Sequence, residues 1–310
     1  MIAKNLDNIN LEEFPVVIFG SGPAGLTTAL ELEKKKIKCL VIEAGGETYD
    51  KDSQDFYKGK ITGDHLTNIS LSRLRQLGGT SGHWGGWSKP MENYSKVSQN
   101  FYKGKVIGDP LTDISNSRLR QFGGTSGHWG GWCKPLEYYS FDNWVLKAND
   151  LENYKNQTCE ILNIKNQFRR SRLNDYFNQI EFQYSKVRFA EKYKNHIKNS
   201  KNIHLVLNTH LSHFEGENKV VDKAVCISKK TLIKIKSKYF ILACGGIENS
   251  RILLWTREKN KDLIEKKLPL GKYWMNHPWI VAGIGVINKK KIIKKLRDGF
   301  INYDGPIQFA

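Results

Sequence analysis

A glycine-rich turn near the N-terminus constrains the fold more than any other feature of this 310-residue chain. An apolar run at residues 14–19 leads into the turn G-S-G-P-A-G at residues 20–25, and a helical stretch follows at residues 26–36. A second apolar run, residues 39–42, ends at Glu43. This order of strand, G-x-G-x-x-G turn, helix, strand and acidic residue is typical of a dinucleotide-binding βαβ unit.

Each part of this unit has a predicted role. Gly20 permits the tight turn, Gly22 lets the backbone approach a pyrophosphate, and Gly25 lets the helix pack close to the sheet. The helix N-terminus offers free N–H groups and a positive dipole end to the phosphates. Glu43 is predicted to accept hydrogen bonds from the adenosine ribose hydroxyls, which favours FAD or NAD over NADP. A purely structural glycine turn is the alternative.

A tandem repeat follows the βαβ unit. Residues 55–99 and 100–144 align without gaps and are identical at 31 of 45 positions. Two copies are too few for a solenoid, so the pattern favours duplication of one segment inside a normal fold. We expect one copy to be functional and the other to be spare. The choice between them stays open, with a slight preference for the second copy because its continuation reads as native sequence.

The longest block that the copies share is G-G-T-S-G-H-W-G-G-W, at residues 78–87 and 123–132. Paired glycines let the backbone approach a flat ring or a phosphate closely, and the block adds hydroxyls, an imidazole and an indole ring. A glycine-rich loop with a structural histidine is the alternative. The predicted cofactor-binding residues are Gly78, Gly79, Thr80, Ser81 and His83 in the first copy, and Gly123, Gly124, Thr125, Ser126, His128 and Trp129 in the second.

Four separated motifs resemble those of the glucose-methanol-choline (GMC) family of flavoproteins, particularly the branch related to pyranose oxidase and bacterial sugar dehydrogenases. They are residues 17–25 with E-A-G at 43–45, the repeated block, I-L-A-C-G-G-I-E-N-S-R at 241–251, and G-K-Y-W-M-N-H-P at 271–278. The resemblance implies an α/β fold with a Rossmann-like FAD-binding domain and an incomplete α+β substrate domain. It also implies an FAD-dependent oxidoreductase that acts on CH–OH groups of an alcohol or sugar, with hydride transfer to flavin N5.

The resemblance adds further candidate residues. Residues 238–243 are predicted to form a strand that returns to the Rossmann sheet and touches the FAD, which makes Ala243 and Gly245 cofactor-binding candidates. Leu211 resembles the family's apolar residue whose backbone meets the adenine. In pyranose oxidase-like members the histidine of the repeated block is bonded to the flavin 8α-methyl group. Covalent attachment through His128 or His83 is therefore a hypothesis for this chain.

The local pattern of the later sequence predicts a mixture of strands and helices. Short strands are expected at 202–207, 211–214 and 224–228, with a turn at 215–218, and a helix is expected at 248–255. A further helix is expected at 151–162, with a loop-like stretch around 185–191.

The expected domains follow from these motifs. The FAD-binding domain comprises 1–144 and 201–278, and the partial substrate domain comprises 145–200 and 279–310. By resemblance, the catalytic histidine and its histidine or asparagine partner are expected beyond Ala310. No catalytic residue is therefore assigned, and the chain is expected to be the N-terminal portion of the enzyme.

The amino-acid composition bears on the binding partners of the chain more than on its fold. Lys and Arg number 49 against 31 Asp and Glu, a formal net charge of +18. The lysines are spread over the chain without a nucleic-acid-binding motif, so no nucleic-acid partner is expected. The five scattered cysteines form no C-x-x-C pair, which argues against a zinc site and favours the cytoplasm. No stretch approaches the roughly 20 apolar residues of a membrane span.

Two other functions stay open at this point. The chain could bind FAD without turning anything over, because no base for the alcohol proton is assigned within it. An NAD-dependent dehydrogenase without flavin is the second, since a Rossmann turn alone does not separate NAD from FAD. A small-molecule alcohol or sugar is the expected substrate, and no metal is expected.

Overall fold

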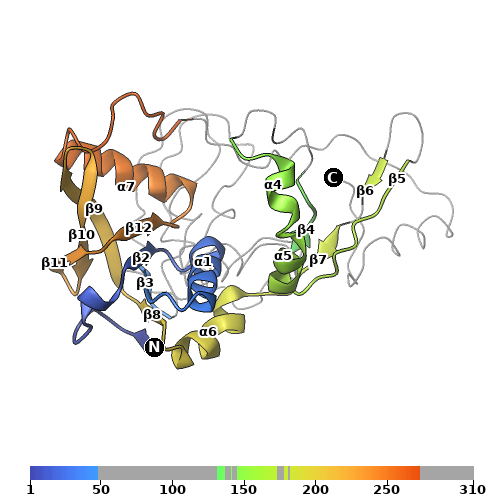
Figure 1. Ribbon diagram of the computed structural model, residues 1–310, viewed down its shortest axis with the longest axis horizontal. Helices are drawn as coiled ribbons and strands as arrows, with labels where there is room; N and C mark the ends of the chain where they lie inside the picture. The colour runs from blue at the N-terminus through green and yellow to red at the C-terminus, as the bar shows by residue number, and fades with distance from the viewer. Residues whose placement is uncertain (48–130, 137–140, 142–144, 173–177, 181, 273–310) are drawn as a thin grey trace, which may run out of the picture. The chain divides into compact units, whose positions relative to one another are not determined.

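The computed structural model describes residues 1–47, 131–136, 141, 145–172, 178–180 and 182–272 (Figure 1). The described residues belong to two compact units. Unit 1 contains residues 1–47 and 188–272, and unit 2 contains the described residues between 131 and 187.

Unit 1 is built on a five-stranded parallel sheet with the strand order β1-β8-β3-β2-β12. In chain order its strands are β1 (Ile2–Ala3), β2 (Val16–Phe19), β3 (Cys39–Ile42), β8 (Ile203–Val206) and β12 (Tyr239–Leu242). The predicted α/β class and the Rossmann-like arrangement are confirmed, because β2 and β3 run in parallel and are joined by α1 (Pro23–Lys34).

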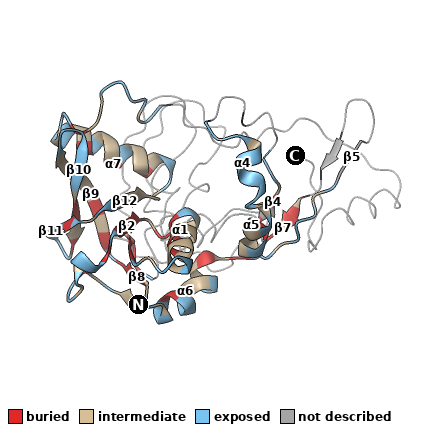
Figure 2. Cartoon of the chain, viewed as in Figure 1, coloured by how far each residue is buried: buried red, intermediate tan, exposed pale blue. Residues whose placement is uncertain are grey.

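Both faces of this sheet are covered, which explains why β2 and β3 are apolar at every position. Every residue of these two strands is buried (Figure 2). Helix α1 packs on β2, β3 and β8, and α6 (Phe189–Asn199) also packs on β8. Residues around 189–191 were expected in a loop, and that prediction is wrong because α6 begins at Phe189.

An antiparallel three-stranded sheet of order β11-β10-β9 forms the second layer of unit 1. Its strands are β9 (Thr209–Glu217), β10 (Val220–Ser228) and β11 (Thr231–Lys236). Phe214 of β9 meets Phe19 of β2 edge to face, with ring centroids 5.9 Å apart. Phe214 and Phe19 belong to one apolar cluster with residues of both sheets, so the two sheets share a core.

The turns of this antiparallel sheet differ from the sequence prediction. Asn218 and Lys219 both have positive φ and join β9 to β10 as a two-residue turn, so the turn expected at 215–218 lies too early. Lys229 and Lys230 form the same kind of turn between β10 and β11. Strand β11 was not predicted.

Helix α7 (Gly246–Lys259) packs against β9. The backbone N–H of Phe214 donates to Thr256 Oγ1 at 3.1 Å, and Asn260 Nδ2 donates to the Gly216 carbonyl at 2.8 Å. Two hydrogen bonds therefore connect the far end of α7 to the middle and end of β9.

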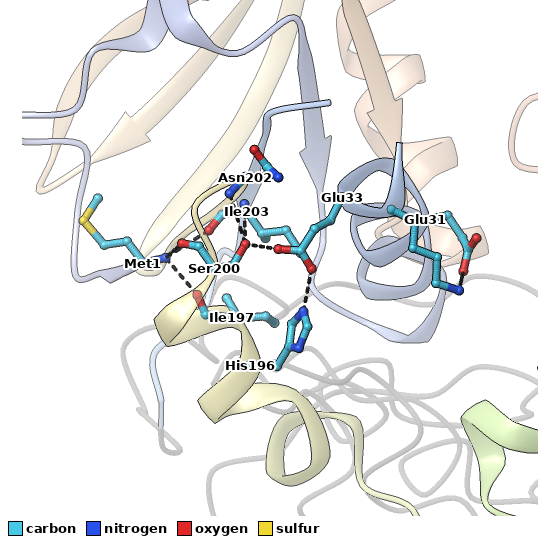
Figure 3. Close-up of polar contacts among 9 residues, drawn as sticks. Met1, Glu31, Glu33, His196, Ile197, Ser200, Asn202 and Ile203 are labelled. Atoms are coloured by element: carbon cyan, nitrogen blue, oxygen red, sulfur yellow. Dashed lines mark hydrogen bonds and ion pairs between the residues drawn. The ribbon is translucent and has the colours of Figure 1, made fainter. Parts of the chain in front are cut away.

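A polar cluster connects α1 to the end of α6 (Figure 3). Glu33 of α1 accepts a hydrogen bond from Ser200 Oγ, and its other carboxylate oxygen lies 2.5 Å from His196 Nε2. Ser200 Oγ in turn accepts from the backbone N–H groups of Asn202 and Ile203. The cluster fixes the chain where α6 turns into β8.

Unit 2 contains short elements. They are β4 (Trp132–Cys133), α4 (Ala148–Glu152), α5 (Lys155–Leu162), β5 (Arg170–Arg172), β6 (Asn178–Ile180) and β7 (Gln183–Tyr184). Strand β4 pairs with β7, and β5 pairs with β6, both antiparallel. A single helix was expected at 151–162. The structure has two helices there, because the helical conformation is interrupted at Asn153 and Tyr154. Among the described residues of the whole chain, no helix is long and apolar enough to cross a membrane.

Candidate functional site

The carboxyl ends of three parallel strands bring the predicted site residues of unit 1 together. Gly20 follows β2 and donates its N–H to the Ile42 carbonyl of β3 at 2.8 Å. Ala243 follows β12 and donates to the Phe19 carbonyl of β2 at 2.7 Å. Glu43 follows β3 at the same edge of the sheet. Ligands of open parallel sheets bind at this edge.

There is no room for a side chain at Gly20, in the turn between β2 and α1, or at Gly25, in the first turn of α1. Gly20 has φ +100°, and a Cβ there would lie 2.5 Å from the Ala243 carbonyl oxygen. A Cβ added at Gly25 would overlap the Gly20 carbonyl oxygen. The three segments therefore approach one another at backbone distance, which only glycine allows.

The first turn of α1 presents backbone donors at this edge. Gly22 is the N-cap residue and Pro23 begins the helix, and within the described structure the N-cap makes no side-chain hydrogen bond to the free N–H groups. The N–H groups of a first helical turn have no intrahelical partner. Such donors, together with the helix dipole, suit a phosphate group.

Glu43 is held in a fixed orientation. Its side chain is only 3 % exposed. Oε2 accepts from the Ser21 N–H at 3.0 Å and from Ser21 Oγ at 2.7 Å, and Oε1 accepts from the Gly45 N–H at 2.9 Å. A carboxylate has about four acceptor positions, so this one retains acceptor capacity beside three bonds that hold it in place.

Sequence reasoning missed Ser21 as a partner of Glu43. The available signal was weak: Ser21 occupies an x position of the G-x-G-x-x-G turn, where many residue types fit. Ser21 is fully buried, so its hydroxyl has little access to water and depends on Glu43 as its acceptor.

The end of β12 is shaped by Asn249, which sequence reasoning also missed. Asn249 Oδ1 accepts from the Cys244 N–H at 2.9 Å, and Nδ2 donates to the Leu242 carbonyl at 3.3 Å. Gly245, the N-cap of α7, has φ +82°, and a Cβ there would meet no described atom within 4 Å. The backbone at Gly245 therefore borders open space in the described structure.

Leu211 is a buried residue of β9, 3 % exposed, and pairs with Cys226 of β10. Its side chain belongs to the core shared by the two sheets. The structure therefore assigns its side chain to packing.

The remaining predicted site residues lie outside the described residues. They are Gly78, Gly79, Thr80, Ser81 and His83 of the first copy, and Gly123, Gly124, Thr125, Ser126, His128 and Trp129 of the second. Within the described ranges, no group of three or more His, Cys, Asp or Glu side chains could hold a metal ion.

These features fit an adenine dinucleotide. The first turn of α1 offers donors for a pyrophosphate, Glu43 offers an oriented acceptor for ribose hydroxyls, and the glycines keep the cradle free of side chains. Residues 13–78 match the family described as FAD binding domain. FAD is the cofactor. The match includes Gly20, Gly25 and Glu43 of this cradle.

Several solved structures are similar to this chain. They include pyridoxine 4-oxidase from Mesorbium loti (14 % identity, TM-score 0.44), a fungal aryl-alcohol oxidase (13 %, 0.47) and an FAD-dependent oxidoreductase from Chaetomium thermophilum (13 %, 0.45). The similarities cover 76 %, 78 % and 77 % of this chain, and 50 %, 47 % and 46 % of the respective structures. The chain thus spans about half the length of these proteins. No curated protein sequence matches the chain significantly.

Proposed function

We propose that this chain is the FAD-binding part of an oxidoreductase that acts on CH–OH groups of an alcohol or sugar. The observation that carries the FAD-binding role is the oriented Glu43 carboxylate beside the uncapped first turn of α1. The substrate class is supported by the motifs at residues 241–251 and 271–278, which resemble those of GMC enzymes.

Bound FAD would supply a hydride acceptor at flavin N5 for oxidation of the CH–OH carbon. The residues of this chain would bind and orient the dinucleotide: the first turn of α1 would hold the pyrophosphate, and Glu43 would accept hydrogen bonds from the ribose. One described histidine, His204, is a poor candidate for the base that removes the alcohol proton. Its ring packs against Phe14, and burial lowers its pKa.

The first test is FAD binding by the purified 310-residue chain. We expect a flavin absorption spectrum and a titration in which FAD binds and NAD does not. Glu43→Gln should weaken FAD binding about tenfold, the loss expected for one charge-assisted hydrogen bond. Glu31→Gln is the control, because Glu31 is a partly exposed residue of α1 paired with Lys34. NAD binding without FAD binding would instead support the dehydrogenase alternative.

A second test addresses activity. An alcohol or sugar that bleaches the flavin of this chain would support catalysis by the chain itself. FAD binding without bleaching by any alcohol or sugar would support the alternative of a binding module. Flavin that stays with the protein after acid precipitation would support covalent attachment through His128 or His83, and full release of the flavin would exclude it.

A further inference from the structure

The end of the second repeat copy is built into unit 2. In the β4–β7 pair, Trp132 lies opposite Tyr184 and Cys133 lies opposite Gln183. Just before β4, the Gly131 carbonyl accepts from the Ser185 N–H at 2.7 Å. Gly131 has φ +67°, and a Cβ there would overlap the Ser185 carbonyl oxygen. The position of residues 131–133 beside β7 and Ser185 is called the β4 slot below. Its first residue, Gly131, must be glycine.

Buried polar contacts hold the other side of the slot in place. Ser185 is fully buried and donates from Oγ to the Leu162 carbonyl at the end of α5, at 2.5 Å. The same oxygen accepts from the Val187 N–H. Gln183 is buried and donates to the Gln167 carbonyl at 2.6 Å. The strand that receives β4 is thus anchored independently of β4.

Both copies carry a sequence that could enter this slot. Residues 86–90 of the first copy read G-W-S-K-P, and residues 131–135 of the second read G-W-C-K-P. The glycine that the slot requires is present in each. Glycine alone therefore does not decide between the copies.

The copies differ where the structure buries side chains. Cys133 is 8 % exposed, and the first copy has Ser88 at the equivalent position. Phe141 is 6 % exposed, and the first copy has Lys96 there. A lysine ammonium in place of a buried phenyl ring costs several kcal/mol unless it finds a partner. Burial of Phe141 therefore favours the second copy.

We infer that the fold uses the end of the second copy, at residues 131–136 and 141, and that the first copy, residues 55–99, is dispensable for folding and for FAD binding. The statement about FAD rests on the proposed function, whereas the statement about folding does not. The two are therefore tested by separate measurements.

Cysteine labelling tests which copy occupies the slot in the intact chain. Burial raises the pKa of the Cys133 thiol to about 12, so the occupied slot leaves little thiolate to react. We expect iodoacetamide to label Cys133 at least about tenfold more slowly in buffer than in urea, as for fully buried Cys39. Peptide mass spectrometry reports each site. Labelling of Cys133 at the urea rate while Cys39 stays protected would overturn the inference.

Matched substitutions supply a second measurement. Gly131→Ala and Gly86→Ala make the same change in nearly the same local sequence. We expect Gly131→Ala to lower the melting temperature and expose Cys133, and Gly86→Ala to change neither. Equal effects, or an effect of Gly86→Ala alone, would contradict the inference.

Deletions of 45 residues test dispensability and function together. Removal of 55–99 should leave the melting temperature and FAD content of the chain unchanged, and removal of 100–144 should lower both. Loss of folding or of FAD only on removal of 55–99 would overturn the inference. If neither the intact chain nor the 55–99 deletion binds FAD while Cys133 stays protected, the proposed function fails and the assignment of the slot stands.

Discussion

Ser21 donates two hydrogen bonds to one oxygen of Glu43, from its backbone N–H at 3.0 Å and from its hydroxyl at 2.7 Å. The two residues follow adjacent parallel strands, so the contact links the glycine-rich turn to the acidic end of β3. Rotation of the Glu43 carboxylate would break both bonds. The acceptor proposed for the ribose is therefore positioned before any ligand arrives.

Removal of the Ser21 hydroxyl should loosen this acceptor. Ser21→Ala keeps the backbone bond to Glu43 but loses the one from Oγ, at an expected cost of about 1–2 kcal/mol in unfolding free energy. FAD affinity should fall about fivefold to tenfold. Urea unfolding and FAD titration measure the two effects. Thr28→Ala is the control, since the hydroxyl of Thr28 donates to the Ala24 carbonyl within α1. Unchanged FAD affinity in Ser21→Ala would refute the positioning role.

A methyl group at Gly25 should separate α1 from the sheet. The added Cβ would overlap the Gly20 carbonyl oxygen, which is backbone and moves only with the turn itself. We expect Gly25→Ala to destabilise the chain by about 3 kcal/mol and to abolish FAD binding at concentrations that saturate the unaltered chain. Glu31→Ala, at a partly exposed position farther along α1, should do neither. A thermal melt of Gly25→Ala that matches the unaltered chain would show that the turn adapts.

Asn249 should act through both of its side-chain atoms. Asn249→Ala removes the bonds to the Cys244 N–H and the Leu242 carbonyl, and should cost about 2 kcal/mol. Asn249→Asp keeps the acceptor but places a carboxylate oxygen against the Leu242 carbonyl, so it should be at least as destabilising at neutral pH. Exposed Glu258→Gln of α7 is the control. Greater stability of the aspartate variant than of the alanine variant would mean that the donor bond contributes little.

The Glu33 cluster should make stability depend on pH. Burial alone would raise the pKa of Glu33, but hydrogen bonds from Ser200 and His196 lower it below its ordinary value of 4.5. A carboxyl with a lowered folded pKa stabilises the fold fully above pH 4.5, and this stabilisation is lost as the pH falls through the folded pKa. Glu33→Gln should therefore be less stable than the unaltered chain at neutral pH, and the difference should shrink below pH 4.5. Urea unfolding across this range gives the measurement. A constant difference would exclude Glu33 as the titrating group.

His204 should destabilise the fold under acid conditions. Burial lowers its pKa below 6.5, its ring packs 4.8 Å from that of Phe14, and its buried Nδ1 has no hydrogen-bond partner among the described residues. A histidine with a lowered folded pKa leaves stability intact above pH 6.5, and stability falls below it because protonation favours the unfolded chain. His204→Leu should raise the free energy of unfolding by about 1 kcal/mol at neutral pH. The increase should be larger at pH 5.5, about one unit below the ordinary pKa of histidine. A loss of stability at both pH values would indicate an unrecognised partner of His204.

Local signals account for the parts of the fold that the sequence predicted correctly. The signals for β2, β3 and the glycine-rich turn lie within about 30 residues of sequence. Both strands are apolar throughout because both of their faces are buried. The strands expected at 202–207 and 238–243 agree with β8 and β12, whose apolar residues also lie in the sheet.

Two of the missed features depend on conformations or contacts that no local pattern shows, and a third had a local signal. The turn at Lys229 and Lys230 uses positive φ at two lysines, whereas glycine or asparagine is the usual signal. In α6, Phe189, Tyr193 and Ile197 recur every four residues, a helical spacing that could have identified this helix. The bond between Ser21 and Glu43 joins residues 22 positions apart and follows from the paired strands.

The strand order of the parallel sheet also affects the order in which the chain can fold. Strands β2 and β3 pair with each other, but their outer neighbours, β12 and β8, begin at residues 239 and 203. During synthesis, the outer edges of β2 and β3 therefore stay unpaired until β8 and β12 have been synthesised. Unpaired edges favour association between chains, so the nascent chain is most vulnerable to aggregation before residue 242 leaves the ribosome.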